Sequence, residues 1–220
     1  MNTLYVFGCS YSETFSSSTY SDYINYLQST PKSWSELLSE NLNLKLHNTA
    51  EGGSSNNEIF EKVCKSVDLL KENDILIIQW SFLHRFRLAE EDGDGWQRLG
   101  VSSDVDYWPV EFINKIAMNK TKKVWKEEIY NFQKIINKLC EEIGCKVYYW
   151  YVGNDFIYDK VDIQNESQYL LNDVKTNPLL HIQNLGEVPI EIETNGEVND
   201  KHFGTSAHNK IFELFLNQIK

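Results

Sequence analysis

The sequence predicts an α/β protein in which helices cover both faces of a mostly parallel sheet. Short apolar runs of strand length alternate along the chain with longer segments whose apolar residues recur at helical spacing. This alternation favours parallel strands joined by right-handed crossovers. The 220 residues contain no linker-like stretch and suffice to bury a substantial core. We therefore predict one three-layer α/β/α sandwich that spans residues 1–220.

Four segments have the composition of strands inside such a sheet. Most are short apolar runs bounded by turn residues or polar loops, and one alternates apolar and polar residues. The predicted strands are 3–8 (TLYVFG), 43–48 (NLKLHN), 74–80 (DILIIQW) and 145–152 (CKVYYWYV).

Four other segments carry apolar residues at helical spacing, and several have start or stop signals. Ser33 followed by Glu36 is the pattern of a capping box. Ser54 or Ser55 can cap the next helix, and Gly144 is a typical helix end. The predicted helices cover 33–42, 54–73, 123–144 and 205–219.

Three segments show no such pattern. Residues 12–26 are rich in Ser and Tyr and predict a long polar loop. Residues 86–122 are rich in Gly, Asp and Trp, and we expect an irregular insertion that forms a lid or a substrate wall. Residues 154–198 receive no assignment.

Charge and composition exclude several classes of function. The formal net charge of -11 argues against a nucleic-acid partner, because binding to phosphates depends on Lys and Arg. The basic stretch 114–126 is interpreted as a solvated approach to a helix. The longest apolar run is too short to span a bilayer, and the first residues have no basic signal-peptide region. We expect a soluble cytoplasmic protein with no membrane partner, although an extracellular route without a cleaved signal stays open. The oligomeric state is not readable.

The cysteines and the first loop also exclude common sites. The four Cys residues lack the paired spacing of a zinc site and indicate reduced thiols. A phosphatase loop built on Cys9 would need an Arg about six residues later, where Phe15 stands. Residues 9–18 contain no glycine, so the phosphate cradle of a flavin or nucleotide site is missing. We expect no metal and no cofactor.

Ligands of parallel sheets bind beyond the carboxyl ends of the strands, and polar motifs gather at those places. Ser10 follows the first strand, and two glycines within 48–56 precede a helix N-terminus whose amides can stabilise an oxyanion. Asp200 and His202 lie in the loop before the last helix, where Asp200 can orient the imidazole while its other nitrogen takes a proton.

In this order and spacing, the motifs FGCSYSE, NTAEGGSSNNEI and NDKHFG resemble those of the SGNH (GDSL-like) hydrolases. This resemblance covers nearly the whole chain and implies a flavodoxin-like α/β/α fold. It implies Ser10 as nucleophile, His202 as base and Asp200 as its acid. It also implies an oxyanion hole formed by the amides of Ser10 and Gly53.

Two motifs depart from the family pattern. The family's third block usually supplies an Asn to the oxyanion, and here Ser81 occupies its place, with Gln79 as another donor. Loss of a good donor costs on the order of a hundredfold in rate, so weak activity or a specialised substrate is one reading of this change. The acid of many relatives lies three residues before the histidine, where this chain has Asn199, and we favour Asp200 instead. His208 is the rival base and is expected to be a packed or surface residue within the last helix.

The resemblance implies a serine-dependent carboxylic ester hydrolase acting on a small-molecule or saccharide acyl ester, with carbohydrate O-acetyl esterase among the activities. The alternatives are an acyltransferase that uses the same residues and a non-catalytic carbohydrate-binding or scaffold protein on the same fold. Gln79, Trp80 and Arg85 are candidate substrate-binding residues, and Arg85 could hold an acidic substrate group or form a surface ion pair. An aromatic platform for a sugar would draw on Trp80, Trp96, Tyr107 and Trp108, which are otherwise core or lid residues.

Overall fold

A parallel sheet forms the centre of the computed structural model, which describes residues 1–16, 18–83, 85–89, 96–99, 122–151, 170, 189–200 and 202–220. Within these residues the central sheet has four strands in the order β2-β1-β3-β6, and all neighbouring pairs are parallel. This order matches the start of the flavodoxin-like arrangement. The strands are β1 (Thr3–Phe7), β2 (Lys45–Asn48), β3 (Ile75–Trp80) and β6 (Lys146–Tyr151).

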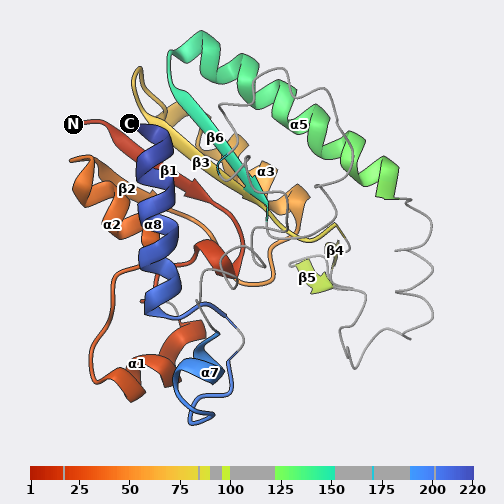
Figure 1. Ribbon diagram of the computed structural model, residues 1–220. Coiled ribbons are helices and arrows are strands. Elements are labelled where there is room, and N and C mark those ends of the chain that lie inside the picture. Colours follow the sequence, from red (N-terminus) through yellow and green to blue (C-terminus); the bar gives the residue numbers. More distant parts are fainter. Residues whose placement is uncertain are drawn as a thin grey trace.

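Helices cover both faces of this sheet, as the sequence predicts (Figure 1). On one face α3 (Asn56–Lys65) and α5 (Lys122–Ile143) pack against alternate residues of the central strands. On the other face α2 (Trp34–Asn41) and α8 (Thr205–Ile219) pack against the residues in between. Burial on both faces explains why β1 and β3 are almost continuous apolar runs. The α/β/α class is confirmed.

Helix ends follow the predicted signals. Ser33 and Glu36 form a reciprocal capping box at the start of α2. Ser55 caps α3, because its hydroxyl accepts a hydrogen bond from the amide of Glu58 at 3.4 Å. Gly144 follows the end of α5 with a φ of 83°, a backbone conformation that glycine adopts without strain. The second predicted helix was too long, since α3 ends at Lys65 and a 3-10 turn (Val67–Leu69) follows.

The segments predicted to be irregular contain short elements. The polar stretch 12–26 includes a 3-10 turn (Ser18–Tyr20) and α1 (Ser21–Leu27), and 154–198 includes α7 (Ile190–Glu193). Tyr23 is the buried residue of α1, and Ile24 and Leu27 pack beside it, so few apolar residues mark this short helix in the sequence. The buried cluster beside α1 and α7 consists of Phe15, Tyr20, Tyr23, Ile190 and Val198. Within 86–122, β4 (Phe86–Ala89) and β5 (Trp96–Leu99) form an antiparallel pair.

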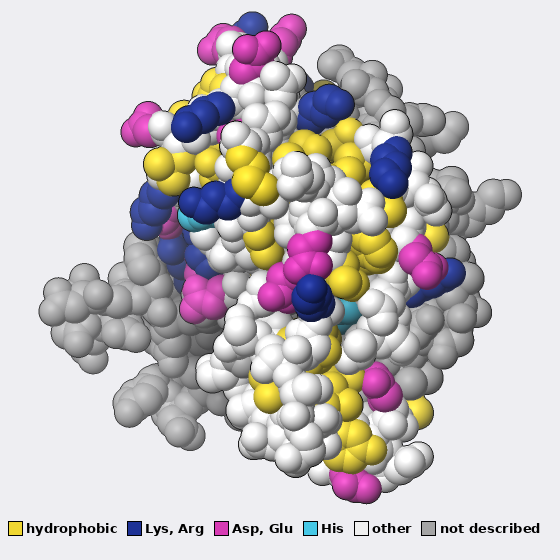
Figure 2. All heavy atoms as spheres, turned by 90° about the vertical axis from the view of Figure 1, so that its left-hand side faces the viewer, with side chains coloured by type: hydrophobic (Ala, Val, Ile, Leu, Met, Phe, Trp, Pro, Cys, Tyr) yellow, Lys and Arg dark blue, Asp and Glu magenta, His cyan; other side chains and the backbone are white. Residues whose placement is uncertain are grey.

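The surface mixes charges of both signs. On the face shown in Figure 2, Lys and Arg side chains are scattered among Asp and Glu, and hydrophobic side chains lie between polar ones. Among the described helices, none combines the length and apolar character that a membrane crossing requires.

Candidate active site

The Ser10 turn lies at the carboxyl end of β1. The chain leaves the strand at Phe7 and forms a 3-10 turn over Ser10–Ser12, closed by a hydrogen bond from the Ser12 amide to the Cys9 carbonyl at 2.9 Å. Ser10 is only 2% exposed, and its hydroxyl has no hydrogen-bond partner among the described residues. Its carbonyl accepts a hydrogen bond from the Tyr20 hydroxyl at 2.7 Å. The backbone of Ser10 is thus fixed, and its buried Oγ makes no hydrogen bond to the described residues.

Gln79 supports this turn from the neighbouring strand. The Cys9 amide donates to Gln79 Oε1 at 3.2 Å, and Gln79 Nε2 donates to Cys9 Sγ at 2.9 Å. A Cβ on Gly8 would lie 2.7 Å from Gln79 Oε1, so glycine is needed for this close approach. Both polar atoms of the buried Gln79 side chain are therefore bonded to Cys9. Gln79 supports the Ser10 turn from inside the protein and does not offer a donor to an oxyanion or a substrate.

His202 and Asp200 form a close pair that packs against the two tyrosines next to the Ser10 turn. The His202 Nδ1 atom lies 2.6 Å from Asp200 Oδ1, which also accepts the His202 amide at 2.8 Å. The imidazole packs edge-on against Tyr11 and Tyr20, with ring centroids 5.6 Å and 5.8 Å away. Since Tyr11 adjoins Ser10 and Tyr20 binds its carbonyl, these contacts bring the imidazole to the Ser10 turn. Asp200 occupies Nδ1 and leaves Nε2 for proton transfer.

The charge of Asp200 suits this arrangement. Burial alone would raise the pKa of Asp200, but hydrogen bonds from His202 and the nearby imidazole charge outweigh burial, so the pKa is lowered. Asp200 is therefore ionised at neutral pH. Asn199, the alternative orienting residue, is exposed.

Sequence analysis missed Tyr11 and Tyr20. Burial raises the pKa of both phenols. The pKa of Tyr20 is raised well above its usual value, because nearby charges, of which Glu13 is the largest, act in the same direction as burial. Both therefore stay protonated, and Tyr20 can donate to the Ser10 carbonyl at any physiological pH. No local pattern distinguishes these tyrosines from others in the chain; only the packing around His202 identifies them.

The amides of Ser10 and Gly53, which the motif resemblance assigns to an oxyanion hole, lie in two neighbouring loops. Among the described residues, the amides of Ser10 and Gly53 have no hydrogen-bond acceptor. Gly53 has a φ of 76°, which favours glycine. The neighbouring Gly52 amide donates to Glu13 Oε1 at 2.8 Å, which ties the loop after β2 to the Ser10 turn. The two free amides thus belong to loops that are joined directly.

Ser81 follows β3 and is held by Asn56. The Ser81 amide donates to Asn56 Oδ1 at 2.7 Å, and Asn56 Nδ2 donates back to the Ser81 carbonyl at 3.2 Å. The Ser81 hydroxyl accepts a hydrogen bond from Arg85 Nη1 at 3.0 Å. This bond leaves the hydroxyl hydrogen of Ser81 available for donation.

Trp80 lies in the core. It is fully buried and stacks on Phe132 and Tyr149, with ring centroids 6.2 Å and 6.3 Å away. In this position it contacts no solvent and cannot form a sugar platform. The remaining platform candidates fall outside the described part of the structure: the side chain of Trp96, Tyr107 and Trp108.

His208 is a structural residue of the helical layer. Its Nδ1 accepts the Trp34 amide at 3.1 Å, and its ring packs against Phe15 with centroids 4.5 Å apart. Full burial, assisted by the nearby His202 charge, lowers the pKa of His208 to about 3. His208 is therefore neutral, and its Nδ1 is bonded to the first residue of α2. This position does not suit His208 as the catalytic base in place of His202.

Protonation of His208 is expected to limit stability in mild acid. The unfolded chain binds a proton at this residue below its ordinary pKa of 6.5, whereas the folded protein does so only near pH 3. Stability that is fully present above pH 6.5 is thus lost as the pH falls, by about 2 kcal/mol between pH 7 and pH 5. Urea unfolding at these two pH values measures the loss. His208→Asn keeps an acceptor for Trp34 and should show a smaller loss; equal losses in both proteins would contradict this role.

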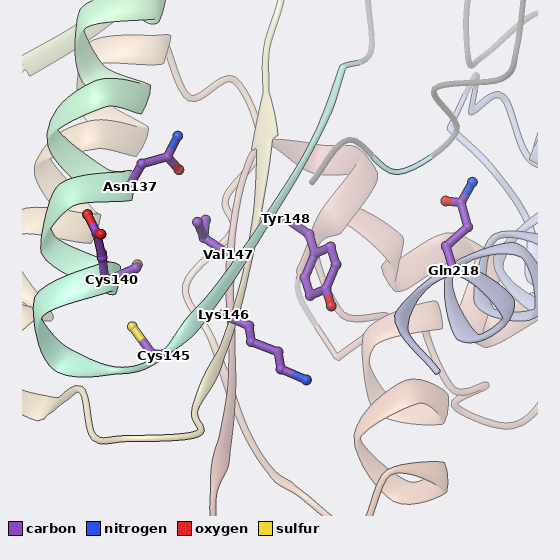
Figure 3. A pocket seen from close by; sticks show the side chains of 8 residues that line it. Asn137, Cys140, Cys145, Lys146, Val147, Tyr148 and Gln218 are labelled. Carbon is purple, nitrogen blue, oxygen red and sulfur yellow. The ribbon is translucent and has the colours of Figure 1, made fainter. Parts of the chain in front are cut away.

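A separate pocket of about 340 Å³ lies at the amino end of β6 (Figure 3). Its walls come from α5, β6 and α8, and they include none of the residues predicted for the active site. Cys140 and Cys145 approach each other from α5 and the start of β6. Across the described residues, no group of three or more His, Cys, Asp or Glu is arranged to hold a metal ion.

Comparison with known proteins finds structural likeness at a distant level. The sequence matches no model of a protein family, and no curated protein matches it. Among solved structures, protein YxiM of Bacillus subtilis is similar, with a TM-score of 0.49 and 14% identity. The match covers 99% of this chain and 56% of that protein, so the chain spans little more than half the length of YxiM. At this distance the likeness transfers neither site residues nor activity.

Proposed function

We propose that the protein is a serine-dependent acyl ester hydrolase. The observation that carries the proposal is the 2.6 Å contact between His202 Nδ1 and Asp200, made beside the Ser10 turn. Nucleophilic catalysis by serine requires a base with one free nitrogen and a partner that fixes its other nitrogen. The motif resemblance to SGNH hydrolases assigns the same three residues.

In this mechanism Ser10 Oγ attacks the ester carbonyl while His202 Nε2 takes its proton. The amides of Ser10 and Gly53, with the Ser81 hydroxyl, stabilise the negative charge on the carbonyl oxygen. His202 then returns the proton to the departing alcohol and activates water, which releases the acid and restores Ser10. Asp200 stabilises the imidazolium throughout. A carbohydrate O-acetyl ester is the substrate that the resemblance favours, and an acceptor alcohol in place of water would give acyl transfer.

The test is covalent labelling with a fluorophosphonate, followed by mass spectrometry of the modified peptide. We expect an adduct on Ser10 that disappears in His202→Ala. Ser12→Ala is the matched control, because Ser12 lies in the same turn and is equally buried but has no catalytic role. An adduct on another residue, or none at all, would refute the mechanism.

A further inference from the structure

Arg85 is a cation held firmly beside the proposed active site. Its backbone amide donates to the Phe82 carbonyl at 3.2 Å, and its guanidinium lies 5.0 Å from the Phe82 ring centroid. Nη1 also donates to the Ser81 hydroxyl at 3.0 Å. A surface arginine without a ligand would normally sample many rotamers, whereas these contacts fix the guanidinium at the end of β3.

The neighbours of Arg85 place it on the catalytic side of the sheet. Arg85 is bonded to Ser81, which is the first residue after β3. Because β3 and β1 are parallel neighbours, Ser81 and the Ser10 turn both lie at the carboxyl end of the sheet. The hydroxyl of Tyr11 is within electrostatic reach of both Arg85 and Asp200. The Tyr11 ring in turn contacts His202. Arg85, through Ser81, and His202, through Tyr11, therefore both adjoin the residues that follow β3 and β1 at the carboxyl end of the sheet.

Arg85 has no carboxylate partner among the described residues, although the chain carries 32 acidic and 21 basic residues. The nearby Arg87, by contrast, is paired with Glu61 of α3. A partly buried guanidinium without a counter-charge is unfavourable, and such a charge at a site commonly receives an anion from the ligand. The fork of donors on an arginine matches a carboxylate, and one positive charge balances one carboxylate.

We propose that Arg85 binds a carboxylate of the substrate, so that the enzyme prefers acyl esters that carry a free carboxylate near the ester bond. This inference rests on the proposed hydrolase function. The preference would distinguish the protein from an esterase of neutral substrates.

The test compares two substrates that differ only in this charge: the 4-nitrophenyl monoester of succinate and its neutral methyl ester. We expect Arg85→Gln to lower kcat/KM for the charged ester by about tenfold or more, since hydrogen bonds to charged groups are the strong ones. The neutral ester should lose less, because only the Ser81 hydroxyl that Arg85 holds is affected there, so the ratio of the two kcat/KM values falls. Arg85→Lys, which keeps the charge but loses the fork, should recover part of the preference. Arg87→Gln is the matched control and should leave the ratio of the two kcat/KM values unchanged.

Two outcomes would overturn the inference while the hydrolase function stands. If Arg85→Gln leaves the ratio of kcat/KM for the charged and neutral esters unchanged, the guanidinium does not bind the carboxylate. An equal loss for both esters would show that Arg85 acts on the oxyanion, which both substrates share.

Failure of the hydrolase function itself is recognised separately, by the absence of Ser10-dependent turnover of either ester. In that case binding of monomethyl succinate, followed by ligand-observed NMR, decides the question. Binding to the wild type that is lost in Arg85→Gln supports a carboxylate site. Equal binding to both proteins, or none to the wild type, overturns it.

Discussion

Ser10→Ala is expected to lower kcat for acyl ester hydrolysis by about a thousandfold or more, because no other group can form the acyl-enzyme. The loss should be confined to turnover. Ser10 makes no side-chain hydrogen bond among the described residues, so its removal leaves no donor or acceptor stranded and the fold should be retained. Activity on a panel of acyl esters, measured together with the unfolding midpoint, tests both statements.

Ser12→Ala provides the comparison for this loss. Both serines lie in the same 3-10 turn, both are buried, and neither hydroxyl has a partner in the described structure. A general effect of packing would therefore appear in both variants, whereas a nucleophile is lost only in one. Unchanged hydrolysis by Ser10→Ala in a pure preparation would disprove the mechanism.

Asp200→Asn is expected to have the second largest effect, on the order of a thousandfold in kcat. An amide can still accept one hydrogen bond, but it cannot stabilise the imidazolium, and it can turn its NH₂ group toward the ring and fix the wrong tautomer. The measurement is the pH profile of kcat/KM for the wild type and the variant. The position of the acid is tested by Asn199→Ala, which should behave like the wild type because Asn199 is exposed. A larger loss in Asn199→Ala than in Asp200→Asn would reverse the assignment.

The layers of the fold could be predicted because they follow from local patterns. Apolar runs in β1 and β3, helical periodicity in α5 and α8, and the Ser33 cap are all readable over a few residues. The short helix α1 was not readable, since only Tyr23, Ile24 and Leu27 pack inward and they stand among Ser, Tyr and Asn residues that also occur in polar loops. Its stability comes from contact with the distant α7 cluster.

The site was predictable only in part. Motif order predicts Ser10 and His202 as site residues, whereas their environment depends on contacts between distant loops. Gln79 and Trp80 show why. Adjacent residues of a strand point to opposite faces of the sheet, and when both faces are buried the sequence does not reveal which residue points to which face. Gln79 therefore supports the Ser10 turn, and Trp80 enters the core on the α3 and α5 side.

The separation of Ser10 from His202 along the chain has a consequence for folding. One residue follows the first strand and the other precedes the last helix, so the four described strands of the sheet lie within or before the segment that joins them. Contacts that close so long a loop form late, because their entropic cost is offset only when the intervening structure is in place. Catalytic competence would then return after secondary structure during refolding, and enzymatic turnover would report on the docking of α8 rather than on the formation of the sheet.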